Sequence, residues 1–361
     1  MSSGAEASTP ARPAAASTAR QIVLAVLRTL LPIVLALVVG GFILLLLQAD
    51  PIAYYGYVLQ RGLLRASGLQ ETIVRAAPLL MIAAGLIIAF RAGIWNLGVD
   101  GQFLLAAVIT AALAPELVGP IGRYPTIVVC LIVAFLVGAA WSLVPALLKA
   151  RFGVNEIITT LMMSFLGTSF ANVLIKIPFH DPATTVPQTK TLDVVDRLPR
   201  LGDTTINSGI ILAVIAVLFV HFLMTRTAFG LKLQIVGANP RAAVHAGLSV
   251  PKLTYATFAL SAGFAGLAGA IDILGVWGNV RNDWNPAYGM LVIPIVFLAR
   301  FHGVAVIGFV LFFAALQIGG ESAARRVGVP TFYTLLLVAL LLMFLAVVEY
   351  LDHRWRERTK A

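Results

Sequence analysis

The stretch "RAGIWNLGVDGQFLLAA", residues 91–107, places an arginine, an asparagine, an aspartate and a glutamine between two apolar segments. An apolar run precedes it at 76–90, and a second run begins at Phe103. Three glycines punctuate the polar part. Irregular backbone at membrane depth is tolerated only where protein or a water-filled cavity surrounds it. The stretch therefore predicts helices packed in a membrane, with a break between two of them.

The composition of the whole chain points to the same class of protein. Of its 361 residues, 60% are hydrophobic and 12% are charged, whereas soluble domains carry about 25% charged residues. Several apolar runs approach or exceed the roughly 20 residues that cross a bilayer as a helix. The sequence therefore predicts an all-α fold: a polytopic transmembrane helical bundle of about ten spanning helices, some of them broken or short.

The formal net charge of +10 would suggest nucleic acid in a soluble protein. In a membrane protein, anionic lipid headgroups and the excess of Lys and Arg in cytoplasmic loops explain it, and no nucleic-acid partner is expected. The single cysteine, Cys130, lies in an apolar run and is interpreted as an inert thiol. The sequence has no metal-spaced Cys/His cluster, no glycine-rich phosphate loop and no visible nucleophile–base arrangement. We therefore expect no catalytic residue, no metal and no cofactor on this chain.

The apolar segments define the expected domain organisation. Segments 76–90 and 287–299 are short for a full crossing. Ten crossings place both termini on one side, and the Lys/Arg distribution, including the basic end "HRWRERTK", favours the cytoplasm. The two longest outer loops are then expected at 48–75 and 178–208. We expect a disordered cytoplasmic tail at 1–29, a transmembrane domain at 30–350 and a basic cytoplasmic tail at 351–361. The ten segments are 30–47, 76–90, 103–119, 125–148, 155–177, 209–224, 254–277, 287–299, 303–319 and 333–350.

The fifth apolar segment is the most polar one. Spacings of three and four residues place much of its polar set on one helical face, which in a bilayer turns toward other helices or water. One interpretation is interhelical packing, and the other is a translocation pathway. The candidate path residues are Asn155, Glu156, Thr159, Thr160, Ser164 and Asn172.

The seventh segment contains "SAGFAGLAGAID", in which Ala262, Gly266 and Ala270 are four residues apart. Small residues at this spacing favour close helix–helix contact, so packing is the prediction. Asp272 near the end of the segment is interpreted as a solvated residue at the outer interface.

The loop 225–252 contains "NPRAAVHAG", with an N-cap asparagine at 239, proline at the first helical position and a stop glycine at 247. This predicts a two-turn helix, which is too short to span and is marginal alone in water. Either a separate partner docks on it, or it rests on its own domain or on lipid headgroups.

The break at 91–102 also has two interpretations. Arg91 is either a cytoplasmic anchor followed by a simple turn, or the start of a true interruption between two short helices. In the second interpretation, polar side chains bond freed backbone groups or neighbouring helices, and the segment acts as a structural hinge near the cytoplasmic gate. The candidate gate residues are Arg91, Asn96, Asp100, Gly101 and Gln102.

Four stretches carry a family resemblance: "FRAGIWNLGVDGQ" (90–102), "KARFGVNEIITTLMMSF" (149–165), "VGANPRAAVHAGLSV" (236–250) and "FLARFHG" (297–303). In this order they resemble permease subunits of ATP-binding-cassette importers of the branched-chain amino acid/ribose/nucleoside type, most closely the nucleoside or simple-sugar branch. The sequence departs from the family pattern at Asp100, Ser164, Arg241, Ala299 and Gly303.

The resemblance implies a transport subunit, not an enzyme, of a bacterial inner membrane. A second, similar permease would complete a heterodimer, and separate ATPase subunits, holding ATP and Mg²⁺, would drive alternating access for a nucleoside or simple sugar delivered by an extracytoplasmic binding protein. The resemblance also implies that the short helix of the loop 225–252 is the coupling helix. Its candidate residues are Asn239, Pro240, Arg241, Ala242, Ala243 and Gly247.

Two other functional classes of membrane protein are alternatives to this interpretation. An ion-coupled secondary transporter would require acidic residues at the midplane and paired broken helices, and the short segments 76–90 and 287–299 lie in different halves of the chain. A membrane-embedded enzyme would require a metal or nucleophile motif, which the sequence lacks.

Overall fold

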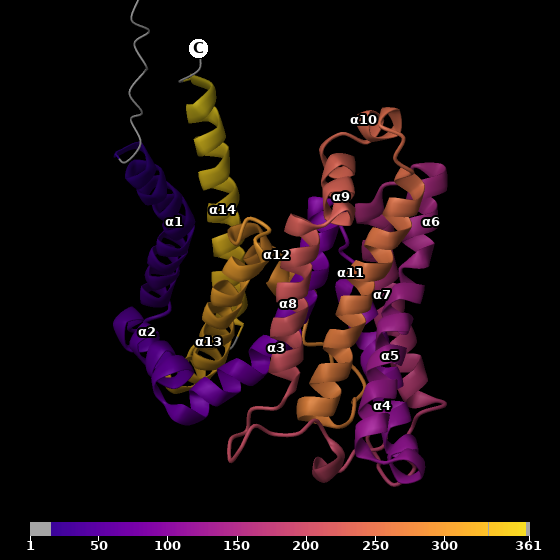
Figure 1. The fold of residues 1–361 in the computed structure, drawn as a ribbon. Coiled ribbons are helices and arrows are strands. Elements are labelled where there is room, and N and C mark those ends of the chain that lie inside the picture. The colour runs from indigo at the N-terminus through magenta and orange to yellow at the C-terminus, as the bar shows by residue number, and fades with distance from the viewer. Residues whose placement is uncertain (1–15, 331, 359–361) are drawn as a thin grey trace, which may run out of the picture. The chain divides into compact units, whose positions relative to one another are not determined.

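The computed structural model describes residues 16–330 and 332–358, and regular structure in these residues is helical (Figure 1). The chain divides into two compact units, residues 1–51 with 335–361, and residues 52–334. The α-helices are α1 (Ala16–Leu46), α2 (Pro51–Leu59), α3 (Ala66–Arg91), α4 (Val99–Ile121), α5 (Arg123–Trp141), α6 (Leu143–Phe152), α7 (Glu156–Lys176), α8 (Gly209–Arg226), α9 (Ala228–Ala238), α10 (Pro240–His245), α11 (Val250–Asp272), α12 (Tyr288–Leu298), α13 (Gly303–Val327) and α14 (Tyr333–Arg358).

The described residues contain seven helices that are long and apolar enough to cross a membrane. Shorter apolar helices at Leu30–Leu46, Tyr288–Leu298 and Tyr333–Val348 account for the remaining predicted segments. The prediction of an all-α, multi-pass helical fold with some short helices is therefore confirmed. The seven long helices are Ala66–Arg91, Val99–Ile121, Arg123–Phe152, Glu156–Lys176, Gly209–Arg226, Val250–Trp277 and Gly303–Val327.

The first unit consists of α1 and most of α14. Of the expected tail at 1–29, residues 1–15 lie outside the described residues, and α1 already begins at Ala16. Ala, Arg, Gln and Leu are good helix formers, so the helix extends beyond the apolar run that begins at 30. Similarly, α14 continues to Arg358 into the expected tail at 351–361, whose residues 359–361 are not described.

Helix α3 lies at the centre of the second unit and packs against α8, α11, α12 and α13. Its residues from Ala76 to Ala89 are all buried. The prediction that segment 76–90 is short is wrong, because α3 begins at Ala66. The polar residues Gln70, Glu71 and Arg75 interrupt the apolar run but not the helix. The expected outer loop 48–75 accordingly contains α2, a π-helical turn at Gln60–Leu64 and the start of α3.

Small residues bring α4, α5 and α11 into close contact, as the seventh segment predicted. A Cβ atom at Gly266 would lie 2.1 Å from the backbone oxygen of Ala134, and one at Gly269 would lie 2.4 Å from that of Phe103. Since real Cβ atoms do not come this near, only glycine permits these backbones to approach.

The two ends of the second unit differ in what they carry. Figure 1 shows α10 at one end and the long loop between α7 and α8 at the opposite end. This loop pairs with the chain after α11 through Leu192 N–Gly278 O at 3.0 Å and Leu198 N–Leu274 O at 2.8 Å. The end of α11 is thereby covered by the loop.

Candidate functional site

The break between α3 and α4 covers residues 92–98 and is organised around Asn96, which is fully buried. The Asn96 Nδ2 group donates to Gln102 Oε1 at 3.0 Å and to Ser261 Oγ of α11 at 3.1 Å. Its Oδ1 atom accepts from the Gly98 amide and from Gln102 Nε2, both at 3.1 Å. The side chain therefore satisfies a freed backbone group and ties the break to α11.

Helix α7 closes another side of the break. Thr160 Oγ1 accepts from the Leu97 amide at 3.1 Å, and Ser164 Oγ accepts from the Gly101 amide at 3.1 Å. A Cβ atom at Gly101 would lie 2.8 Å from Ser164 Cα, so glycine is needed for this crossing. Thr160 and Ser164, two of the candidate path residues, thus serve the packing interpretation of the polar face.

The charged residues of the break contact other elements. Asp100 Oδ1 accepts from the Gly289 amide in the first turn of α12 at 2.7 Å. Arg91 Nε donates to the carbonyl of Phe301, between α12 and α13, at 3.1 Å. The segment is therefore more than a simple turn, although its flanking helices are 26 and 23 residues long and not short as expected. Its role as a gate stays a prediction.

The candidate path residues lie along α7 from its N-cap to its last turns. Asn155 caps α7 by accepting from the Ile157 amide, and Glu156 forms an ion pair with Lys149 at 2.7 Å. Thr159 bonds back to the Asn155 carbonyl at 3.3 Å. Asn172 lies toward the other end of α7, where it accepts from the Asp283 amide at 2.9 Å. Asn155 and Glu156 line a cavity of about 520 Å³ beside Pro240.

The short helix of the loop 225–252 forms as predicted. Asn239 Oδ1 accepts from the amides of Arg241 at 3.0 Å and Ala242 at 3.1 Å, and proline occupies the first turn. Gly247 follows with φ 77°, the left-handed conformation that glycine adopts without strain. Within α10 only Ala243 is buried, by packing toward α9 and α11. The rest of this helix is exposed.

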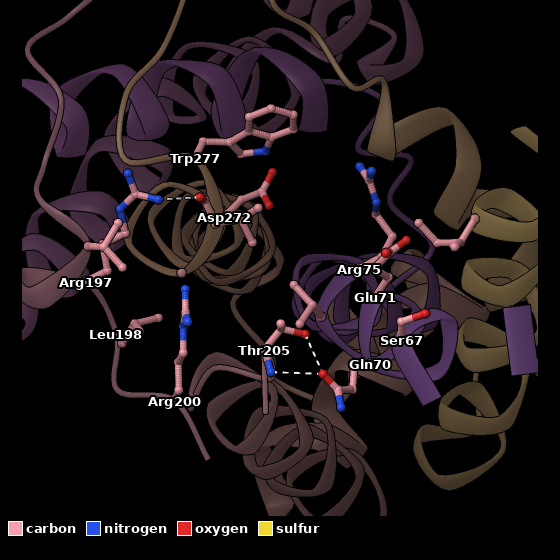
Figure 2. Close-up of a pocket in the computed structure, with 15 residues that line it drawn as sticks. Ser67, Gln70, Glu71, Arg75, Arg197, Leu198, Arg200, Thr205, Asp272 and Trp277 are labelled. Carbon is pink, nitrogen blue, oxygen red and sulfur yellow. Dashed lines mark hydrogen bonds between the residues drawn. The ribbon is translucent and has the colours of Figure 1, made fainter. Parts of the chain in front are cut away.

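The opposite end of the second unit contains a feature that the sequence did not reveal, the α3–α11 cavity (Figure 2). Its volume is about 450 Å³. The lining comes from the first part of α3, the end of α11 and the loop at 194–205. The polar and aromatic lining residues are Ser67, Gln70, Glu71, Arg75, Arg197, Arg200, Thr205, Asp272 and Trp277.

Asp272 is 3% exposed and lines the α3–α11 cavity. The interpretation of Asp272 as a solvated residue at the outer interface is therefore wrong, because the loop before α8 covers the end of α11. Arg75 Nη1 donates to the hydroxyl of the buried Tyr288 at 2.6 Å, and its charge acts on the Asp272 carboxylate. An ionisable residue within a membrane span is a functional candidate by default. Arg75 is such a residue, but the expected loop at 48–75 placed it outside the predicted membrane spans.

The loop side of the cavity is held by hydrogen bonds to backbone. Arg197 Nη1 donates to the Val276 carbonyl at 2.7 Å, and Gln70 Oε1 accepts from the Thr205 amide at 3.0 Å (Figure 2). Burial and the neighbouring charge of Arg200 lower the pKa of the Arg197 guanidinium from its ordinary value, and Asp193 opposes this. Because a guanidinium stays protonated in proteins, Arg197 is interpreted as a charged structural brace.

Comparison with known proteins agrees with this architecture. A family profile described as "Branched-chain amino acid transport system / permease component" matches residues 68–347. A glucose ABC transporter permease protein of Haloferax volcanii is 33% identical over 89% of this chain and 87% of its own length. A guanosine ABC transporter permease protein of Bacillus subtilis is 30% identical over 76% of this chain and 80% of its own length. A second Haloferax volcanii protein, a putative glucose ABC transporter permease, is 32% identical over 57% of this chain and 62% of its own length.

The family profile covers the break at 91–102, α10 and all of the α3–α11 cavity lining except Ser67. The matches confirm the resemblance drawn from the four sequence stretches, and they decide against both an ion-coupled transporter and an enzyme. The chain therefore belongs to the permease components of the branched-chain amino acid transport system family and is a multi-pass membrane subunit of an ABC importer.

Proposed function

We propose that this subunit imports a small neutral solute with a sugar ring, either a simple sugar or a nucleoside. The names of the relatives, glucose and guanosine permeases, support this class. Transport would proceed by alternating access, in which the pathway opens first to the outside and then to the cytoplasm. Separate ATPase subunits would bind ATP and Mg²⁺ and drive the change.

The observation that carries this proposal is the exposed helix α10. A six-residue helix is not stable by itself in water, and here Asn239 and contacts with α9 and α11 preform it. Val244 remains 60% exposed on this helix, together with most of its neighbours. A preformed, partly apolar surface is suited to a groove in an ATPase subunit. Asn239, Pro240, Arg241, Ala242, Ala243 and Gly247 are the proposed coupling residues.

The gate is proposed at the break between α3 and α4. Gly93 has φ 68° and packs closely against Gly237 of α9. A Cβ atom added at Gly93 would lie 3.0 Å from the Cα atom of Gly237. Because α9 leads directly into α10, a displacement of α10 has a short path to the break. Arg91, Asn96, Asp100, Gly101 and Gln102 would transmit it to α7, α11 and α12. Asn155 and Glu156 line the neighbouring cavity and are proposed to face the cytoplasmic part of the pathway.

The remaining partners follow from the same proposal. Haloferax volcanii contains two relatives of this chain that are both named as glucose permeases, which supports a heterodimer with a second permease. An extracytoplasmic binding protein would deliver the solute. We place the subunit in a bacterial inner membrane with both termini and α10 on the cytoplasmic side.

The test is a substitution on the exposed face of α10. Val244→Asp should release the ATPase during mild-detergent purification and lower ATP-dependent uptake of guanosine or glucose at least tenfold. Val186→Asp is the matched control, because Val186 is 56% exposed in the loop between α7 and α8 and does not line the α3–α11 cavity. If Val244→Asp retained both the ATPase and full uptake, α10 would not be the coupling element.

A further inference from the structure

The α3–α11 cavity contains an unmet hydrogen-bond acceptor. Within residues 16–330 and 332–358, the Oδ2 atom of Asp272 has no hydrogen-bond partner, although the residue is only 3% exposed. A buried carboxylate oxygen without a donor is unfavourable, and native proteins supply one from protein, water or ligand. Figure 2 shows this carboxylate turned toward the space between Trp277 and Arg75. The Asp272 carboxylate therefore lies at the wall of the cavity, between the Trp277 indole and Arg75.

The Asp272 carboxylate lies among the side chains of Arg75, Trp277 and Tyr288. The Arg75 guanidinium acts electrostatically on Asp272 and is itself fixed by its 2.6 Å bond to the Tyr288 hydroxyl. Tyr288 is 1% exposed and packs edge-to-face on Phe103, with ring centroids 5.4 Å apart. A charged group fixed in this way is preorganised to bind a ligand.

Trp277 provides an aromatic surface at the same cavity. Its side chain is 42% exposed and lies beside the carboxylate (Figure 2). The flat indole can cover the apolar C–H face of a ring. A cavity of about 450 Å³ is within the usual range for small-molecule sites, about 300–1,000 Å³.

The cavity is lined by charges of both signs, and its buried carboxylate disfavours an anion placed directly beside it. Asp272 and Glu71 both line it, and a buried carboxylate repels an anionic ligand. Among the arginines, Arg75 is engaged with Tyr288 and Arg197 donates to the carbonyls of Leu192 and Val276. Arg200 remains exposed at the rim, where it can donate to a hydroxyl oxygen.

From these features we infer that the α3–α11 cavity binds the ring of a neutral polyhydroxy solute, with the Asp272 carboxylate accepting from vicinal ring hydroxyls and the Trp277 indole covering one face of the ring. This inference rests on the proposed function and adds the site and the recognised group. The vicinal diol is common to a hexose and a ribonucleoside. The cavity lies at the end of the unit opposite α10, where a solute would enter an importer oriented as proposed.

The test measures binding and uptake on the permease–ATPase complex in lipid vesicles, and the binding protein is added only for uptake. Saturation-transfer NMR with guanosine, with D-glucose and with 2′,3′-dideoxyguanosine reports binding without any binding protein. We expect a signal on the ring protons of guanosine or of glucose. The dideoxy analogue, which lacks the diol, should bind at least tenfold more weakly than guanosine if guanosine is the ligand.

Two variants and one control assign the signal to the cavity. Asp272→Asn should weaken binding at least tenfold, since the amide keeps the shape but loses the charge. Trp277→Ala should also weaken it, while Trp277→Phe should retain most of it, and this half-exposed position is replaceable without disturbing the core. Glu116→Gln is the control, because Glu116 is an exposed carboxylate at the same end, paired with Lys190 at 2.6 Å.

The outcomes distinguish failure of the proposed binding site from failure of the proposed function. Unchanged binding in both Asp272→Asn and Trp277→Ala, or no signal from either probe in the unmodified protein, overturns the site. If ATP-dependent uptake of guanosine or glucose persists in that case, the proposed function stands without this site. If no ATP-dependent uptake of either solute occurs, the proposed substrate class falls as well.

Discussion

Asn96 concentrates four hydrogen bonds in one buried side chain, and two of them are a reciprocal pair with the Gln102 amide. Both residues are almost inaccessible, at 0% and 1% exposure. A buried polar group that loses its partner costs about 1–3 kcal/mol. Because several groups depend on it, Asn96 contributes more to stability than an ordinary polar residue of a membrane helix.

We therefore predict that Asn96→Ala destabilises the subunit by about 3 kcal/mol. The substitution removes the acceptor of the Gly98 N–H and of Gln102 Nε2, and it removes the donor to Gln102 Oε1. Thermal unfolding of the purified complex, followed by the loss of monodisperse protein, measures the change. Asn172→Ala is the matched control, because Asn172 makes an exposed bond to the Asp283 amide and should cost less than about 1 kcal/mol. Equal thermal stability of the two variants would contradict a central role for Asn96.

Among the elements, helix existence was predictable from sequence, whereas helix length was not. The apolar runs located the buried part of α3 but not its first ten residues, because Gln70, Glu71 and Arg75 look like loop residues until the cavity they line is known. Asn239, Pro240 and Gly247 predicted α10, since caps and stops are local. The Arg75–Tyr288 pair spans 213 residues of sequence, and only packing brings it together.

The glycine contacts of α11 give a prediction at the level of helix pairs. Gly266→Ala should force α5 and α11 apart, because the new Cβ would lie 2.1 Å from the Ala134 carbonyl oxygen. Overpacking of this kind costs about 1–3 kcal/mol, so the folded yield and the unfolding temperature should both fall. Gly308→Ala in α13 has nothing within 4 Å of its Cβ and should be neutral or slightly stabilising. If Gly266→Ala left the folded yield and the unfolding temperature unchanged, the close α5–α11 contact would not contribute to stability.

For the whole molecule, the orientation in the membrane decides whether the proposals hold together. Basic residues close the last turns of α3, α6 and α8, at Arg91, at Lys149 and Arg151, and at Arg226. Basic residues also close α7 and α13 at the opposite end, at Lys176 and at Arg325 and Arg326, so the proposed orientation rests on the coupling role of α10. An ATPase that hydrolyses cytoplasmic ATP can reach α10 only if this assignment is correct.

The native thiol makes this orientation measurable. Cys130 is buried and should not react with maleimides, so the protein is already a suitable background for single added cysteines. Asp203→Cys, in the exposed loop before α8, should react with a membrane-impermeant maleimide on intact cells, whereas His245→Cys on α10 should react only after the membrane is opened. Adding Cys130→Ala to each variant checks that the label reports the new thiol. Labelling of His245→Cys on intact cells would place α10 outside, and both the coupling role of α10 and the entry of solute at the α3–α11 cavity would then be wrong, because each depends on the same direction of the bundle.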